Sequence, residues 1–169
     1  NILDFQTMKF SYLKHISDDE QSLPNNSIYR LYKDQMDNIW IGSIHGGLFA
    51  IKKVFIKTYK DVPLNNPNGV SERTVVSIFE DKDTLLWIGT DGGGINSFDQ
   101  KTNTFHHYPT TYGEKVTSIT DFSENELLLS CFNKGVYTFN KRTAQMQPFP
   151  IINDSISKRE FSSGDLVNL

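Results

Sequence analysis

A segment of about 47 residues occurs twice in this chain, and this repetition constrains the fold more than any other feature. Each copy has a tryptophan between aliphatic residues, and Trp40 and Trp87 lie 47 positions apart. The aspartates six positions before them, Asp34 and Asp81, have the same spacing. A chain that repeats in this way is predicted to build one structural unit several times.

A third copy, displaced by 41 positions from the second, runs from Val116 to Asp121 and onward to Phe139. It is weaker than the others, because Leu128 stands in place of the tryptophan and Ser130 in place of the following glycine. Within every copy, short runs of β-branched and aromatic residues alternate with polar residues and are interrupted by Asp, Asn and Gly, a pattern typical of strands and hairpins.

Four such runs in each copy, at periods of 47 and 41, match the ~40–50 residues of a propeller blade. The sequence therefore predicts an all-β fold, a β-propeller fragment with about three complete four-stranded antiparallel blades plus partial blades at both ends. We expect one domain over 1–169, with the end of a preceding blade at 1–13, blades at 27–59, 75–108 and 116–149, and the start of a further blade at 166–169.

Composition and charge exclude several classes of protein. Hydrophobic residues make up 37% of the chain and charged residues 22%, which fits a folded domain better than a disordered one. No apolar run approaches the ~18 residues of a membrane helix. The net charge of −3 lacks the basic excess of a nucleic-acid-binding protein. The chain has a single cysteine, Cys131, so an internal disulfide is ruled out. We expect Cys131 to be a small buried residue.

No motif predicts catalysis, a metal or a cofactor. The glycine-rich stretch 89–94 lacks the Lys-Ser/Thr pair and the following helix of a phosphate-binding loop. His106 and His107 are adjacent on a strand and point to opposite faces, so they do not chelate together. Trp40 and Trp87 are expected in the core between blades. We therefore predict a binding module without catalytic residues, metal or cofactor.

Strand direction indicates which loops share a face. The long connections between copies and the loops between second and third strands should lie on one face, here called the top, where propeller ligands commonly bind. Polar residues in or beside these loops are the predicted ligand contacts: Asn26, His45, Arg73, Asp91, Lys115 and Asn133.

The segments Ile39-Trp-Ile-Gly42 with Gly46-Gly47-Leu48, and Leu86-Trp-Ile-Gly-Thr-Asp-Gly-Gly-Gly-Ile95, resemble the two-component regulator propeller repeat. This resemblance implies the periplasmic sensor region of a hybrid two-component histidine kinase of gut bacteria, whose parent spans the inner membrane and controls transcription through a phosphorelay. It also implies an oligosaccharide ligand. No binding residue is transferred from the family, since its ligand residues vary between members.

The function expected from the resemblance is ligand sensing for signal transduction. Two other functions are compatible with the residues, namely a protein-docking propeller scaffold and part of a propeller lyase or hydrolase. No nucleic acid is expected to contact this piece of the chain. Because about three blades fall short of a closed ring, we also expect the isolated chain to self-associate through open blade edges.

Overall fold

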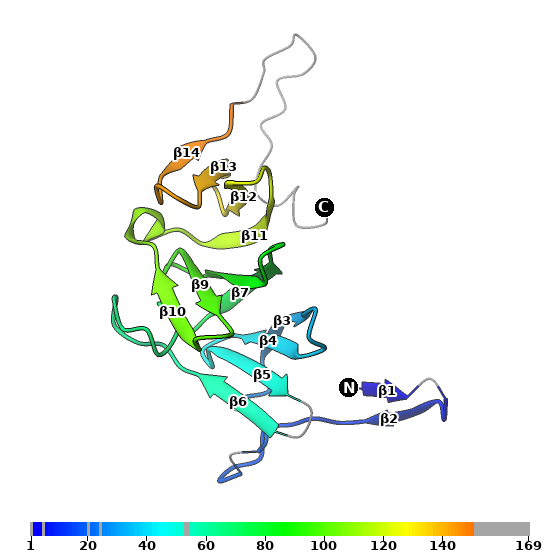
Figure 1. Ribbon diagram of the computed structural model, residues 1–169. Coiled ribbons are helices and arrows are strands. Elements are labelled where there is room, and N and C mark those ends of the chain that lie inside the picture. The colour runs from blue at the N-terminus through cyan, green and yellow to red at the C-terminus, as the bar shows by residue number, and fades with distance from the viewer. Residues whose placement is uncertain (1, 5, 20, 24, 53–54, 151–169) are drawn as a thin grey trace.

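The computed structural model describes residues 2–4, 6–19, 21–23, 25–52 and 55–150. It contains three four-stranded antiparallel sheets and one two-stranded sheet, and in Figure 1 the three larger sheets follow one another along an arc. The two-stranded sheet is β1 (Ile2–Asp4) with β2 (Lys9–Ser11). Sheet 1 contains β3 (Ile28–Lys33), β4 (Ile39–Ser43), β5 (Leu48–Lys52) and β6 (Phe55–Tyr59). Sheet 2 contains β7 (Val75–Glu80), β8 (Leu85–Thr90), β9 (Ile95–Asp99) and β10 (Thr104–His107). Sheet 3 contains β11 (Val116–Asp121), β12 (Glu126–Cys131), β13 (Gly135–Asn140) and β14 (Met146–Pro148).

The prediction of three four-stranded antiparallel units is confirmed. The one helical element described is a short 3-10 turn, η1 (Pro109–Thr111), in the connection before β11. No described segment forms a helix with the length and apolar character needed to cross a membrane. The further blade expected at 166–169 lies outside the described residues.

The core lies between consecutive sheets, as a stack of blades requires. Trp40 of sheet 1 is 0% exposed and Trp87 of sheet 2 is 1% exposed, which confirms that the tryptophans are core residues. Trp40 packs against the facing residues of sheet 2, including Phe98, at 5.4 Å between ring centroids. Trp87 packs in the same way toward sheet 3 and lies 5.9 Å from the ring of Phe139. Each indole therefore joins its own sheet to the next one.

An aspartate at the first hairpin of sheets 1 and 2 orders the turn and fixes the tryptophan. Asp81 Oδ1 accepts the backbone N–H groups of Asp83 and Leu85, and its Oδ2 accepts the indole N–H of Trp87 at 2.9 Å. Asp34 makes the same set of bonds, with Trp40 Nε1 at 2.8 Å. Burial alone would raise the pKa of each carboxyl, but these hydrogen bonds keep it below its ordinary value.

The third sheet lacks this pair altogether. β11 pairs Asp121 with Leu127 as β7 pairs Glu80 with Leu86, so Asp121 occupies the place of Glu80 rather than of Asp81. Phe122 stands at the aspartate position, and its N–H bonds to Glu126 O as the Asp81 N–H bonds to Leu85 O. Aspartate and tryptophan are thus both replaced, by Phe122 and Leu128, and no buried polar group loses its partner.

The glycine after each tryptophan permits close approach of the next sheet. A Cβ on Gly89 would meet Ser77 Oγ and would lie 2.5 Å from the carbonyl oxygen of Val116, the first residue of β11. A Cβ on Gly42 would lie 2.7 Å from Val75 Cγ1 and 3.0 Å from the Val75 carbonyl oxygen. All of these distances are shorter than van der Waals contact, so the close spacing between the sheets depends on glycine at both positions.

The two joints between sheets differ in charge. Between sheets 2 and 3, Lys141 Nζ lies 3.2 Å from Asp81 Oδ2 and 2.8 Å from Asp121 Oδ1. At the equivalent positions between sheets 1 and 2 stand Gln100 and Glu80, and the buried Glu80 Oε1 and Gln100 Nε2 have no hydrogen-bond partner. Burial raises the pKa of the Glu80 carboxyl. The Lys141 ammonium thus joins sheets 2 and 3, whereas Gln100, at the equivalent position between sheets 1 and 2, is neutral.

Candidate functional site

In each of the three sheets, the loop between the second and third strands bonds to the connection that enters the first strand of the same sheet, through a repeated backbone hydrogen bond. The first residue after each second strand donates its N–H to the residue that precedes the first strand of a sheet: Ile44 to Ser27 O, Asp91 to Thr74 O and Phe132 to Lys115 O, at 3.0, 2.9 and 2.9 Å. The strand 2–3 loops and the long connections therefore lie on one face.

In sheets 1 and 2, the glycine before the third strand ties the sheet to the next one on this face. Gly47 N–H donates to Arg73 O at 2.7 Å, and Gly94 N–H donates to Glu114 O at 3.2 Å. Both glycines have positive φ, of 80° and 69°. A Cβ at Gly94 would overlap Thr111, so a larger residue is excluded by both space and backbone conformation.

Three of the predicted contact residues lie around the joint between sheets 2 and 3. Asp91 and Lys115 face each other across an isolated antiparallel bridge, and their side chains form an ion pair at 3.0 Å. Lys115 Nζ also lies 5.2 Å from the centre of the Phe132 ring. Asn133 follows Phe132 in the same loop and has φ of 59°. We call Asp91, Lys115, Phe132 and Asn133 the top cluster.

The other three predicted residues lie elsewhere. His45 and Arg73 flank the joint between sheets 1 and 2: His45 N–H donates to Thr74 Oγ1 at 3.3 Å, and Arg73 Nε is 4.0 Å from Glu72 Oε1. Both side chains are exposed. Asn26 accepts the His15 N–H through Oδ1 at 2.8 Å, and it thereby holds the segment that precedes sheet 1.

Selection by polarity overlooked two exposed aromatic side chains on the same face. Phe132 is 49% exposed and Tyr112, in the connection before β11, is 56% exposed. The internal alignment contains a signal for one of them, because Phe132 takes the position of Asp91 in sheet 2 and of Ile44 in sheet 1. An aromatic ring beside a carboxylate and an ammonium can stack on a ring-shaped ligand while the charged groups bond to its hydroxyls.

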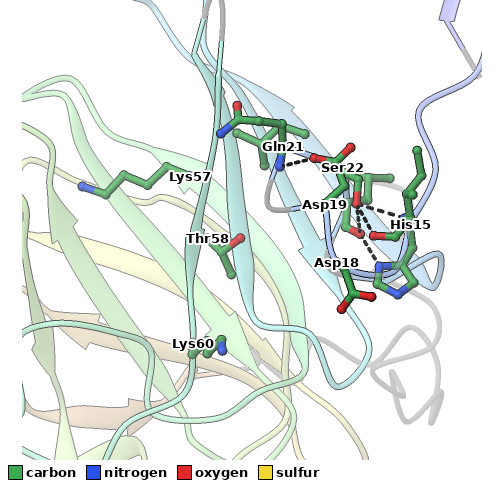
Figure 2. Close-up of a pocket in the computed structure, with 11 residues that line it drawn as sticks. His15, Asp18, Asp19, Gln21, Ser22, Lys57, Thr58 and Lys60 are labelled. Atoms are coloured by element: carbon green, nitrogen blue, oxygen red, sulfur yellow. Dashed lines mark hydrogen bonds between the residues drawn. The ribbon is translucent and has the colours of Figure 1, made fainter.

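A groove at the outer rim was not predicted from the sequence. Figure 2 shows it between residues 15–19 and 21–23 on one side and strand β6 on the other. Its volume is about 650 Å³. Its walls include Asp18 and Gln21 on one side and Thr58 and Lys60 on the other. Only a contact between segments distant in sequence creates this groove, and nothing in the local pattern marked it.

Metal-binding clusters and the cysteine thiol were two further candidates for a chemical site. No group of three or more His, Cys, Asp or Glu side chains in the described residues could hold a metal ion. The Cys131 thiol is buried, and this burial raises its pKa to about 12, so the thiol stays protonated and unreactive near neutral pH.

Two segments of the chain, 22–45 and 69–92, match the family model described as two component regulator propeller. Each covers a connection, the first strand and the Asp–Trp hairpin described above. The chain is thus similar to this family over two segments that make up less than a third of its length. The third copy lies outside the matched segments, in line with its loss of the aspartate and the tryptophan.

The propeller fold is shared with solved structures. The extracellular domain assigned to the hybrid two component system BT3049 of B. thetaiotaomicron superimposes with a TM-score of 0.71 at 21% identity, over 82% of this chain and 20% of that one. PorZ, a surface component of the type-IX secretion system of Porphyromonas gingivalis, has a TM-score of 0.61 at 13% identity, over 91% and 24%. The chain thus spans about one fifth of the length of the first of these structures. No curated protein matches its sequence.

Proposed function

We propose that this chain is part of the extracytoplasmic ligand-sensing propeller of a hybrid two-component sensor. The observation that carries the proposal is the pair of regulator propeller repeats, and a fold shared with an extracellular domain of such a system supports it. In this proposal the piece itself binds and does not catalyse. The parent is a periplasmic sensor anchored in the inner membrane, and it signals to a histidine kinase and onward to transcription.

The proposed ligand is an oligosaccharide held at the top face. The top cluster offers the Phe132 ring as a stacking surface, with Asp91 and Lys115 beside it as hydrogen-bonding groups. Because these residues come from two sheets, a ligand that contacts them all binds one arrangement of the sheets better than another. Such differential affinity is what a sensor needs to shift a population of conformations.

Calorimetric titration with a panel of oligosaccharides tests this proposal. We expect one class of glycan to release heat, and Phe132→Ala to weaken its binding about fivefold or more, because stacking contacts contribute ~1 kcal/mol or more. Phe122→Ala is the matched control, since Phe122 is a similarly exposed phenylalanine in a hairpin at the other end of sheet 3. Absence of heat across the whole panel, or equal losses in both variants, would contradict the proposal.

A second candidate function is protein docking at the same face. The exposed apolar side chains Ile44, Tyr112 and Phe132 favour it, since a partner protein buries such residues better than a glycan does. Binding of a protein that Phe132→Ala abolishes, without binding of any glycan, would identify this alternative.

We further propose that the isolated chain associates with a second copy through open sheet faces. On the face of sheet 1 that points away from sheet 2, Leu31 is 67% exposed, and Ile39 beside it is also exposed. Sedimentation velocity at rising concentration is expected to show dimers, which Leu31→Lys reduces because a charge is costly to bury. A wild-type monomer at every concentration would contradict this.

A further inference from the structure

The rim groove has the size and the lining of a binding site. Its volume of about 650 Å³ falls within the ~300–1,000 Å³ common for ligand sites. In Figure 2, Asp18, Asp19 and Gln21 line the side of the 15–23 segment, and Thr58 and Lys60 lie on the opposite side. Lys57 extends away from the groove, where its Nζ bonds to Asn103 Oδ1 at 2.6 Å.

The groove follows the free edge of a β-strand. β6 is the last strand of sheet 1 and pairs only with β5 among the described strands. Ile56, Lys57 and Thr58 all line the groove, although successive side chains point to opposite faces. A cavity that touches all three must run along the strand edge, where outward backbone N–H and C=O groups can pair with another chain.

In sheet 2, the edge of the fourth strand is covered by a segment of the chain itself. There the edge strand β10 bonds to the connection before β7: Phe105 N–H donates to Pro67 O at 2.8 Å, and His107 Nε2 lies 2.9 Å from Gly69 O. By register, Phe105 and His107 correspond to Ile56 and Thr58 of sheet 1. At this position in sheet 2, therefore, the edge strand binds an extended stretch of polypeptide.

In sheet 1, the described part of the equivalent connection bonds to itself rather than to β6. Ser22 Oγ bonds to both N and O of Ile16, at 2.9 and 3.0 Å, and His15 Nδ1 lies 2.7 Å from Leu23 O. The Thr58 side chain is shorter than that of His107, and it makes no hydrogen bond to the described part of this connection. Among the described residues, β6 makes no backbone hydrogen bond to this connection, and the groove remains between them.

We propose that the rim groove binds an extended polypeptide segment of a partner protein, which adds to sheet 1 as a strand on the free edge of β6. Backbone pairing with Ile56 and Thr58 supplies the affinity, as in other complexes formed by strand addition. Asp18 and Asp19 favour a basic side chain on one flank of the peptide, and Lys60 favours an acidic side chain on the other. This proposal is independent of any ligand at the top face.

Thr58→Pro provides the sharpest test. By register Thr58 directs its N–H outward, so proline removes a donor to the peptide without removing a bond to β5, and edge strands tolerate it there. Thr58→Val keeps the N–H and is the matched control. The probe is a phage-displayed random dodecapeptide library selected on the chain, with the enriched peptides then synthesised and measured by fluorescence anisotropy.

We expect enriched peptides to carry a basic residue, to bind Thr58→Pro about tenfold or more weakly, and to bind Thr58→Val within about twofold of wild type. Bound peptide should also slow hydrogen exchange of the Ile56 and Thr58 amides. Unfolding curves of the two variants check that both are folded. If no peptide is enriched, if proline and valine weaken binding equally, or if protection appears only in a self-associated wild type, the proposal is wrong.

Discussion

Asp81→Ala is expected to lower the free energy of unfolding by about 3–5 kcal/mol, the loss typical of a broken buried ion pair. The substitution leaves the Trp87 indole N–H and the Leu85 N–H without their acceptor, and it removes one of the two carboxylates that hold Lys141. Denaturant unfolding monitored by tryptophan fluorescence gives the free energy directly.

Asp34→Ala is the matched control, because Asp34 makes the same turn and indole bonds but has Gln100 where Asp81 has Lys141. We expect a smaller loss of about 1–3 kcal/mol, that of unsatisfied hydrogen bonds alone. Equal losses in the two variants would show that Lys141 contributes nothing to the joint.

Asp81 also links the stability of the chain to pH. Its pKa is lower in the folded chain than in the unfolded one, so its contribution is complete above the unfolded value near 3.8 and is lost as the pH falls through the folded value. Wild type should therefore destabilise below about pH 4 more steeply than Asp81→Ala does.

Gly89→Ala is expected to destabilise the chain by about 2–3 kcal/mol, although it adds only one methyl group. That methyl would press on the carbonyl oxygen of Val116, a backbone atom that moves only if sheet 3 shifts away from sheet 2. Thermal and denaturant unfolding of the purified variant measure the loss.

Two further glycine variants show whether close approach is the cause. Gly42→Ala would bring its methyl to 3.0 Å from the nearest backbone atom of the next sheet, against 2.5 Å at Gly89, so its effect should be smaller. Gly92 has no atom within 4 Å of its hypothetical Cβ and has φ of 105°, so Gly92→Ala measures the backbone cost alone. A loss at Gly89 no larger than that at Gly92 would contradict the close-approach explanation.

The repeat predicted much of the fold because each copy carries its own strand and turn signals. Trp40 and Trp87 could be placed in the core since both neighbours of each are aliphatic. The register of the third copy was harder. Asp121 has the same residue type as Asp81, but the displacement of 41 places Phe122 at the equivalent position, and the pairing of Asp121 with Leu127 agrees with that placement.

The site was predicted less completely, because binding surfaces depend on segments far apart in the chain. Asp91 and Lys115 could be assigned to one face from strand direction, and the structure brings them into an ion pair. Phe132 was missed because polarity guided the choice. The rim groove could not have been foreseen, since Asp18 and Thr58 come together only when the connection packs on sheet 1.

The paired loss of aspartate and tryptophan in sheet 3 has a consequence for how such tandem copies diverge. If only the aspartate or only the tryptophan is replaced, the remaining partner is left with a buried polar atom that has no hydrogen bond, at a cost of ~1–3 kcal/mol. We therefore expect duplicated units to lose the aspartate and the tryptophan together rather than one at a time. A unit such as the third, in which both residues are replaced, then keeps the blade structure while it loses the two most recognisable residues of its sequence.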